Sequence, residues 1–256
     1  MARFKLRIEY AGTRYSGWQI QKNARTVQGE IDRAIREALR PREFELYGSG
    51  RTDAGVHALA QVAHLDIYTS AAPEQLRRTI NDELPADINI IAVEKVPHRF
   101  HARHDAVARS YVYQISRRRT AFGKPFVWWI KEPLDAGAMR EAAAHFVGMN
   151  DFRGFTDDDP EVKSTLVHVQ ALEIAEAGPL ILIRVQGSHF LWKMVRRIVG
   201  VLAAVGRGEI APRHAVSADL DVAALTAPAA GLFLEGVYYQ GDLSPGPIVP
   251  LLNLLR

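Results

Sequence analysis

The chain has 256 residues and no cysteine, so it has room for one large domain or two small ones but has no disulfide and no thiolate site. It carries 32 lysines and arginines against 29 aspartates and glutamates, and arginine, the better ligand for phosphate, outnumbers lysine. The sequence contains no run of about 18 apolar residues, so it predicts no membrane span. Its N-terminus alternates polar and apolar residues and lacks the apolar block of a signal peptide. We therefore expect a cytoplasmic protein.

The first hundred residues predict the order strand, helix, strand, strand, helix, strand. Apolar residues alternate with charged ones from Phe4 to Tyr10, which indicates a half-buried strand. Thr26 is suited to cap a helix that reaches Leu39. The remaining elements are a second helix from Pro73 to about Asn81 and three strands, expected near 44–46, 58–67 and 88–96.

The second part of the chain repeats this order. The patterns predict a strand at 107–115, a helix from the capping Asp135 to about Val147, a hairpin of 165–174 and 180–186, a helix at 191–205 and a last strand at 233–239. Both halves, 1–105 and 106–256, thus predict a β-α-β-β-α-β unit. We expect an α+β fold with a largely antiparallel central sheet, helices on one side and a cleft between the halves.

The loop Gly48–Ala58 is the most informative stretch, and three glycines within eight residues indicate a sharply turning backbone. It contains one carboxylate, Asp53, two residues after Arg51. A carboxylate beside a guanidinium stays ionised and is suited to act as a nucleophile or an electrostatic stabiliser. The glycine pattern matches neither a dinucleotide-binding fingerprint nor a Walker loop.

Several segments allow two interpretations. Aromatic and amide side chains in the loop 11–23 suit either base stacking or packing on the core. The arginine-rich segment 99–119 suits either a polyanion or ordinary solvation. Arg196 lies close to the apolar stripe of its helix, so it either has a partner such as Asp53 or extends to solvent.

A metal site is a rival interpretation, because Asp53 and His57 are four residues apart and histidines recur at every third position. The three regularly spaced histidines are His98, His101 and His104. The surrounding arginines would repel a cation, so RNA-facing histidines are the simpler alternative. The acidic run 157–159 suits a solvated turn better than a cation site. A metal-dependent RNA hydrolase and a non-catalytic RNA-binding protein remain alternatives.

The loop Gly50–Ala58 resembles the signature of the tRNA pseudouridine synthases of the TruA type. Further segments agree with that family in order and spacing: Gly17-Trp18-Gln19, Thr26-Val27-Gln28, Arg109-Ser110-Tyr111-Val112-Tyr113, Met194-Val195-Arg196, Gly200 and Gly231-Leu232-Phe233-Leu234. The sequence departs from the pattern at Ala11 and Ser49, neither of which is expected to take part in the chemistry.

The resemblance implies an isomerase that converts uridine to pseudouridine at positions 38–40 of the tRNA anticodon stem-loop, acting as a homodimer without metal or organic cofactor. It implies that Asp53 is the nucleophile and that Arg196 pairs with it. Tyr111 would pack on the target base, and Arg51 would enter the space left by the flipped nucleotide. The apolar tail 248–255 suits either the dimer interface or the chain's own core.

Overall fold

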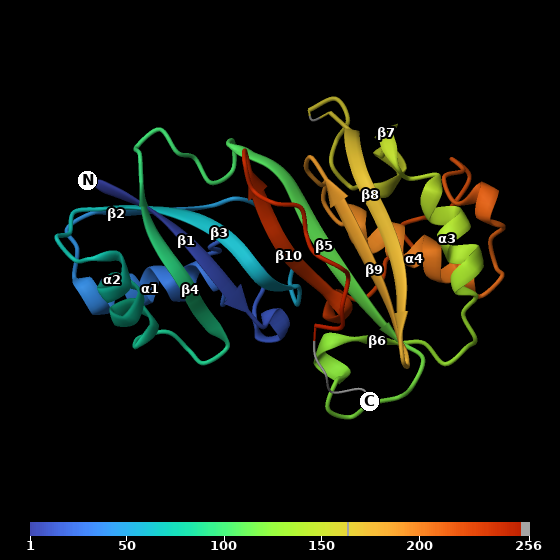
Figure 1. Cartoon of the computed structure of the whole chain (residues 1–256), viewed down its shortest axis with the longest axis horizontal. Helices are drawn as coiled ribbons and strands as arrows, with labels where there is room; N and C mark the ends of the chain where they lie inside the picture. The colour runs from blue at the N-terminus through green and yellow to red at the C-terminus, as the bar shows by residue number, and fades with distance from the viewer. Residues whose placement is uncertain (163, 252–256) are drawn as a thin grey trace. The chain divides into compact units, whose positions relative to one another are not determined.

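The computed structural model describes residues 1–162 and 164–251, and its chain divides into two compact units (Figure 1). Unit 1 comprises Met1–Val107 and Phe233–Leu243, and unit 2 comprises Ala108–Leu232 and the chain from Ser244 onward. The contacts therefore group the last strand with the N-terminal part of the chain, although the sequence places it in the C-terminal half. As a statement about domains, the division between residues 105 and 106 stays a prediction.

Unit 1 is a sheet with two helices. Its elements are β1 (Ala2–Tyr10), α1 (Val27–Leu39), β2 (Phe44–Gly48), β3 (His57–Ile67), α2 (Pro73–Asn81), β4 (Ile88–Val96) and, from the end of the chain, β10 (Leu232–Tyr239). β1 lies between β3 and β4 and is antiparallel to both. β2 is antiparallel to β3, and β10 is parallel to it.

The alternation in β1 separates a core face from an open face. Phe4, Leu6 and Ile8 are at most 2% exposed. Together with the apolar faces of α1 and α2, which contact one another, they form the core of unit 1. The hydroxyl oxygen of Thr26 accepts a hydrogen bond from the amide of Gly29 (3.2 Å), as expected of a helix cap.

The register of β3 places the glycine-rich loop at one end of the sheet. β2 pairs with β3 only over 63–67, and β10 pairs with its first two residues, His57 and Ala58. β3 therefore begins beyond the end of β2. The connection between β2 and β3 crosses the sheet end where β10 joins β3.

Unit 2 has a three-stranded antiparallel core with two short additions. Its elements are β5 (Ala106–Ser116), β6 (Trp128–Trp129), α3 (Ala136–Ala144), β7 (Gly148–Asp151), β8 (Leu166–Ala177), β9 (Leu180–Gly187) and α4 (Met194–Gly206). β9 is antiparallel to both β5 and β8, while β6 is parallel to β5 and β7 is antiparallel to β8. The α+β class and the largely antiparallel strand pairing are confirmed.

The predicted order of the second half was incomplete. β6 and β7 are absent from the prediction, because strands of two and four residues carry too little alternation to be recognised. α3 ends at Ala144 rather than near Val147. The chain turns at Gly148, whose φ of 103° favours glycine, and enters β7.

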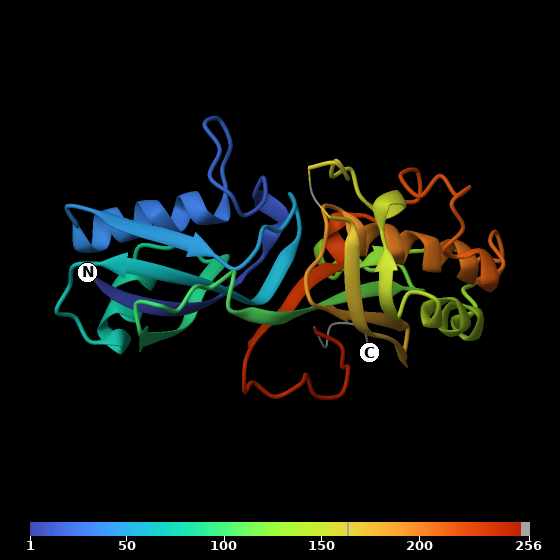
Figure 2. The same cartoon turned by 90° about the horizontal axis from the view of Figure 1, so that it is seen from above.

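Helix α4 is the centre of unit 2 and packs against α3 (Figure 2). It is buried almost all round, as a helix inside a core must be. Gly200 allows the chain to pass close to α4, since a Cβ there would lie 1.6 Å from the carbonyl oxygen of Leu225. No helix in the described part of the chain is long and apolar enough to cross a membrane.

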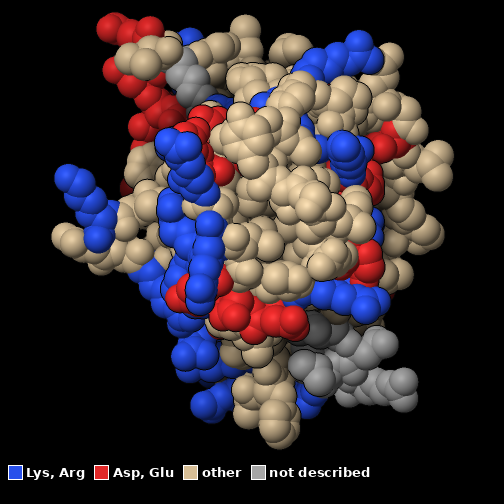
Figure 3. All heavy atoms as spheres, turned by 90° about the vertical axis from the view of Figure 1, so that its left-hand side faces the viewer, with Lys and Arg blue, Asp and Glu red and all other residues tan. Residues whose placement is uncertain are grey.

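The outer helices of unit 1 carry cations that are already paired. On α1, Arg33 pairs with glutamates one turn away and Arg36 pairs with Asp32. On α2, Glu74 binds both Arg77 and Arg78. Figure 3, which views this end of the molecule, shows basic and acidic side chains next to one another.

Candidate active site

The loop Gly48–Ala58, called the aspartate loop below, is anchored to β3 by the buried side-chain amide of a glutamine. Gln61 on β3 is fully buried, and its Oε1 accepts a hydrogen bond from the hydroxyl of Ser49 (2.7 Å). Its Nε2 donates to the carbonyl oxygen of Gly50 (3.2 Å). Buried polar groups of this kind are costly unless satisfied, so the amide fixes the start of the loop.

A second anchor joins the aspartate loop to β1 and to the loop 11–23. The hydroxyls of Tyr10 and Thr52 are hydrogen-bonded (2.7 Å), and the carbonyl oxygen of Thr52 accepts the amide of Trp18 (3.1 Å). Gly17 has a φ of 91°, and a Cβ there would lie 2.6 Å from that same oxygen. Tyr15 and Trp18 are at most 4% exposed. Of the two interpretations of these aromatic rings, core packing is therefore correct.

A third anchor is His57, which closes the aspartate loop. Its Nδ1 accepts the amide of Gly12 (3.0 Å), and its ring stacks on Phe233 of β10 with centroids 4.7 Å apart. A Cβ on Gly12 would lie 1.9 Å from the carbonyl oxygen of Val56. His57 is 1% exposed and supports the loop through hydrogen bonding and stacking.

These anchors leave Asp53 at the outside of a turn. Its carbonyl oxygen accepts the amide of Val56 (3.1 Å), and Gly55 adopts the left-handed conformation with a φ of 79°. Thr52 and Val56 are buried, Asp53 is half-buried and Arg51 is exposed. The loop thus holds one carboxylate at a fixed, partly accessible position, which covalent catalysis requires.

The other two candidate residues belong to unit 2. Tyr111 lies on β5 opposite Val185, is partly exposed and meets the ring of Phe190 edge to face, with centroids 5.3 Å apart. Arg196 lies in the first turn of α4 and is half-buried, and its Nε donates to the carbonyl oxygen of Ala227 (2.7 Å).

The fully buried cation of α4 is Arg197 rather than Arg196. Arg197 is 3% exposed and pairs with Asp157, which also binds Lys193 (2.8 Å). These hydrogen bonds from Lys193 and Arg197 hold the pKa of Asp157 below its usual range. The carboxylate of Asp158 accepts the amide of Trp192 (3.2 Å). Residues 157–159 lie outside the helices and strands, and Asp157 and Asp159 are exposed, as expected of a solvated turn. The acidic run in addition holds the start of α4.

The spaced histidines do not converge on a common point. The ring of His101 lies against His64 and His104, with centroids 4.8 and 4.2 Å away, and Tyr47 stacks on His64. His98 is bonded instead to the carbonyl oxygen of Met1. Within residues 1–162 and 164–251 no group of three or more His, Cys, Asp or Glu side chains is arranged to hold a metal ion.

The buried histidine in this cluster makes stability depend on pH. Burial, with a smaller effect of the nearby Arg3 cation, lowers the pKa of His64 to about 4. The unfolded chain binds a proton near pH 6.5 that the folded chain does not bind until about pH 4, so stability is lost as the pH falls below 6.5. We expect a loss of about 2 kcal/mol between pH 7.5 and pH 5.

Urea unfolding at several pH values tests this expectation. The pKa of Asp66 is lowered by its hydrogen bond to Arg3, so that group contributes only below the pH window used. Burial also lowers the pKa of the neighbouring His101, which therefore contributes in the same window. His64→Gln should still clearly reduce the pH dependence, whereas His214→Gln, at an exposed position, should keep it. An unchanged slope in His64→Gln would contradict the assignment.

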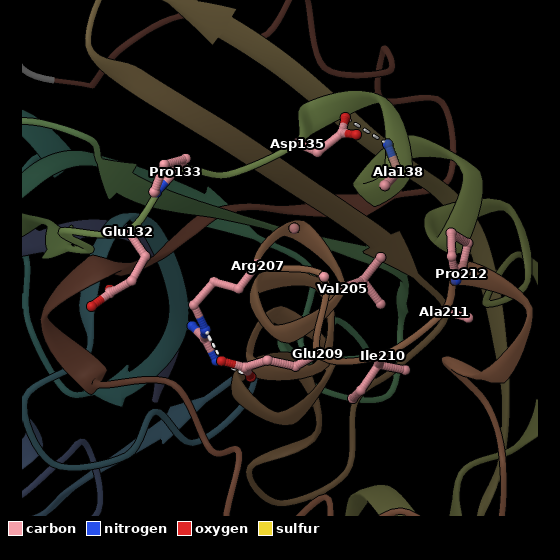
Figure 4. Close-up of a pocket in the computed structure, with 12 residues that line it drawn as sticks. Glu132, Pro133, Asp135, Ala138, Val205, Arg207, Glu209, Ile210, Ala211 and Pro212 are labelled. Carbon is pink, nitrogen blue, oxygen red and sulfur yellow. Dashed lines mark hydrogen bonds and ion pairs between the residues drawn. The ribbon is translucent and has the colours of Figure 1, made fainter.

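A hollow of about 720 Å³ lies elsewhere in unit 2, between the end of α4 and the start of α3 (Figure 4). Its wall includes the ion pair of Arg207 with Glu209 (2.6 Å) and the cap of α3, in which Asp135 accepts the amide of Ala138 (3.0 Å). The C-terminus of a helix carries partial negative charge. This hollow is lined by none of the candidate residues.

The residues that position the aspartate loop were not identified from the sequence. Tyr10, Gly12 and Gln61 contact the loop from outside it, and His57 anchors it from its own end. The available signal was weak: a glutamine within the apolar run of β3 indicates a buried amide in need of partners. The close approach of Gly12 to Val56 has no signature in the local sequence.

Comparison with known proteins finds one family over most of the chain. A family model for tRNA pseudouridine synthase matches residues 7–105 and 142–240. The tRNA pseudouridine synthase A 2 of Clostridium tetani is 38% identical over 244 residues, covering 92% of this chain and 98% of the relative. The tRNA pseudouridine synthase A of Afipia carboxidovorans is 41% identical over 246 residues, covering 93% and 100%.

The chain therefore belongs to the tRNA pseudouridine synthase family, whose members are isomerases. Similarity to the solved archaeal box H/ACA sRNP Nop10-Cbf5 complex is weaker, with a TM-score of 0.36 and 12% identity over 79% of this chain and 42% of that chain. It adds nothing to the family assignment.

Proposed function

We propose that this enzyme converts uridine to pseudouridine at positions 38–40 of the tRNA anticodon stem-loop, with Asp53 as its nucleophile. The observation that carries the proposal is the aspartate loop. Three buried anchors hold its backbone, and a single partly exposed carboxylate stands at its turn. Such preorganisation lowers the barrier because the reacting group is already in place.

The reaction leaves the elemental composition of the nucleoside unchanged, although the hydrogen lost from C5 passes to solvent. The bond between N1 of uracil and C1′ of ribose breaks, the base turns, C5 bonds to C1′, and the hydrogen of C5 is replaced by one on N1. Asp53 provides the temporary covalent bond, either to the uracil ring or to C1′. In both routes the carboxylate must be ionised when it attacks. When its bond to the nucleoside breaks at the end of the reaction, the carboxylate of Asp53 is regenerated.

The remaining candidates have roles consistent with their positions. A base paired in a stem must be extruded at a cost of a few kcal/mol before it can react. Arg51 is exposed beside Asp53 and would fill the space that the base leaves. Tyr111 would pack on the extruded uracil and assist removal of the C5 proton, and Arg196 would pair with Asp53. The proposal includes neither a metal nor an organic cofactor.

The positional part of the proposal is tested by mapping the product. We expect carbodiimide-dependent primer-extension stops at 38–40 of a tRNA transcript, and loss of each stop when that uridine is replaced by cytidine. Pseudouridine at other positions alone would contradict the choice of substrate while leaving the isomerase chemistry intact.

The assembly is tested separately. As part of the proposal the enzyme acts as a homodimer in the cytoplasm, where tRNA is available. Light scattering coupled to size exclusion should give the mass of two chains at micromolar concentration. The mass of one chain throughout that range would contradict a stable dimer.

A further inference from the structure

The connection between β5 and α3 forms a basic surface far along the chain from the aspartate loop. Residues 117–131 contain five cations and no acid. The cations are Arg117, Arg118, Arg119, Lys124 and Lys131, and all five are exposed. We call this segment the basic loop; in Figure 1 it lies at the lower edge of unit 2 and includes β6.

Most of this charge is not neutralised by the residues that the structure describes. Arg117 pairs with Glu176 (2.7 Å) and donates to the carbonyl oxygen of Gly178, which ties the loop to the β8–β9 hairpin. The other four cations form no ion pair with any residue in 1–162 and 164–251. The helices of unit 1 are different, because their arginines are paired with acids on the same helix.

Exposed aromatic rings lie among these cations. Trp129 on β6 is 42% exposed, and the guanidinium of Arg119 lies over its ring, 5.7 Å from the centroid. Phe122 is 85% exposed. An indole beneath a guanidinium offers a surface on which a nucleobase stacks, while neighbouring cations bind phosphates.

The basic loop is held in shape before any partner binds. The amide of Ile130 donates to the carbonyl oxygen of Ser116 (3.0 Å), and Gln114 binds the carbonyl oxygen of Phe126 (3.1 Å). Val127 is buried in a cluster with Leu180 and Leu182, on which Ile248 also packs. A loop held in this way loses little entropy on binding.

We infer that the basic loop is an auxiliary RNA-binding surface that grips tRNA away from the target nucleotide; this inference rests on the proposed function. Ser116, which pairs with Trp129, is five residues from Tyr111 along β5. At about 3.4 Å per residue the two positions are about 17 Å apart. The basic loop therefore binds backbone and an unpaired base at a distance from the flipped uridine.

The test is Arg118→Ala/Arg119→Ala/Lys124→Ala, with Arg33→Ala/Arg36→Ala/Arg78→Ala as a control of equal charge change at paired arginines. In the first variant we expect the Kd for tRNA to rise at least about 10-fold. The slope of log affinity against log salt should become shallower by about 2. kcat/KM should fall in proportion, with kcat at saturating tRNA retained. The control should bind tRNA like wild type.

A second variant separates stacking from charge. Trp129→Ala should weaken binding about 5- to 10-fold without changing the salt slope, and Trp129→Phe should restore most of it. Melting temperatures of all variants monitor folding. Wild-type tRNA affinity in the triple variant overturns the inference. Phosphatidylserine vesicles test an anionic lipid surface as the alternative ligand of the basic loop. If the triple variant loses binding to these vesicles and keeps its binding to tRNA, the inference is also overturned.

The outcomes also distinguish this inference from the proposed function. If wild type forms no pseudouridine but its tRNA affinity depends on the basic loop, the proposed function fails and the RNA-binding surface stands. If wild type forms pseudouridine and the triple variant has an unchanged KM, the inference fails alone.

Discussion

Asp53→Asn is expected to abolish pseudouridine formation while leaving tRNA binding within about threefold of wild type. The amide has the shape of the carboxylate, so the three anchors of the aspartate loop remain, but it cannot form the covalent intermediate. Loss of a nucleophile costs activity by about 10³-fold or more in other enzymes. Single-turnover assays on unmodified tRNA, together with filter binding, measure both quantities.

A matched control is Asp82→Asn at the end of α2, an exposed carboxylate of the same unit. It should retain wild-type turnover. If Asp53→Asn keeps a tenth of the wild-type rate, Asp53 is not the nucleophile.

Gly12→Ala is expected to destabilise unit 1 by about 3 kcal/mol or more and to reduce activity sharply. The added Cβ would lie 1.9 Å from the carbonyl oxygen of Val56, and the obstacle is backbone that cannot turn aside as a side chain would. Overpacking of this kind costs about 1–3 kcal/mol even where neighbours can adjust. Relief of the clash must move the aspartate loop away from Gly12 and lengthen the hydrogen bond between the amide of Gly12 and His57.

Gly50→Ala is the control for stability, because no atom lies within 4 Å of a Cβ at that position in the same loop. Urea unfolding should give a midpoint close to wild type for Gly50→Ala and a clearly lower one for Gly12→Ala. Equal midpoints would show that the close approach of Gly12 to Val56 does not hold the loop.

Local patterns in the sequence were sufficient for the long elements. Alternation in β1 and the apolar stripe of α4 reflect burial on one face or all round, and both were predicted. The aspartate loop was also recognised, because its glycines and charges are adjacent in sequence. The short strands β6 and β7 of unit 2 were not recognised. They have two and four residues and form because they pair with the longer strands β5 and β8, so they leave no local pattern in the sequence.

Contacts between distant segments explain what could not be predicted. The strand β10 groups with unit 1 because it pairs with His57 and Ala58, more than 170 residues earlier. Arg197 is buried because Asp157, 40 residues away, supplies its counter-charge. The helical pattern of the sequence singles out Arg196, and only the position of the acidic run shows that Arg197 is the buried cation.

The most direct test of the central claim is tritium release from tRNA that carries [5-³H]uridine. Isomerisation must replace the hydrogen on C5, whereas binding or strand cleavage need not. We expect wild-type enzyme to release tritium in the presence of EDTA, in amounts equal to the pseudouridine formed. Intact tRNA binding without tritium release from any of several tRNAs would contradict the assignment of this chain as a uridine isomerase.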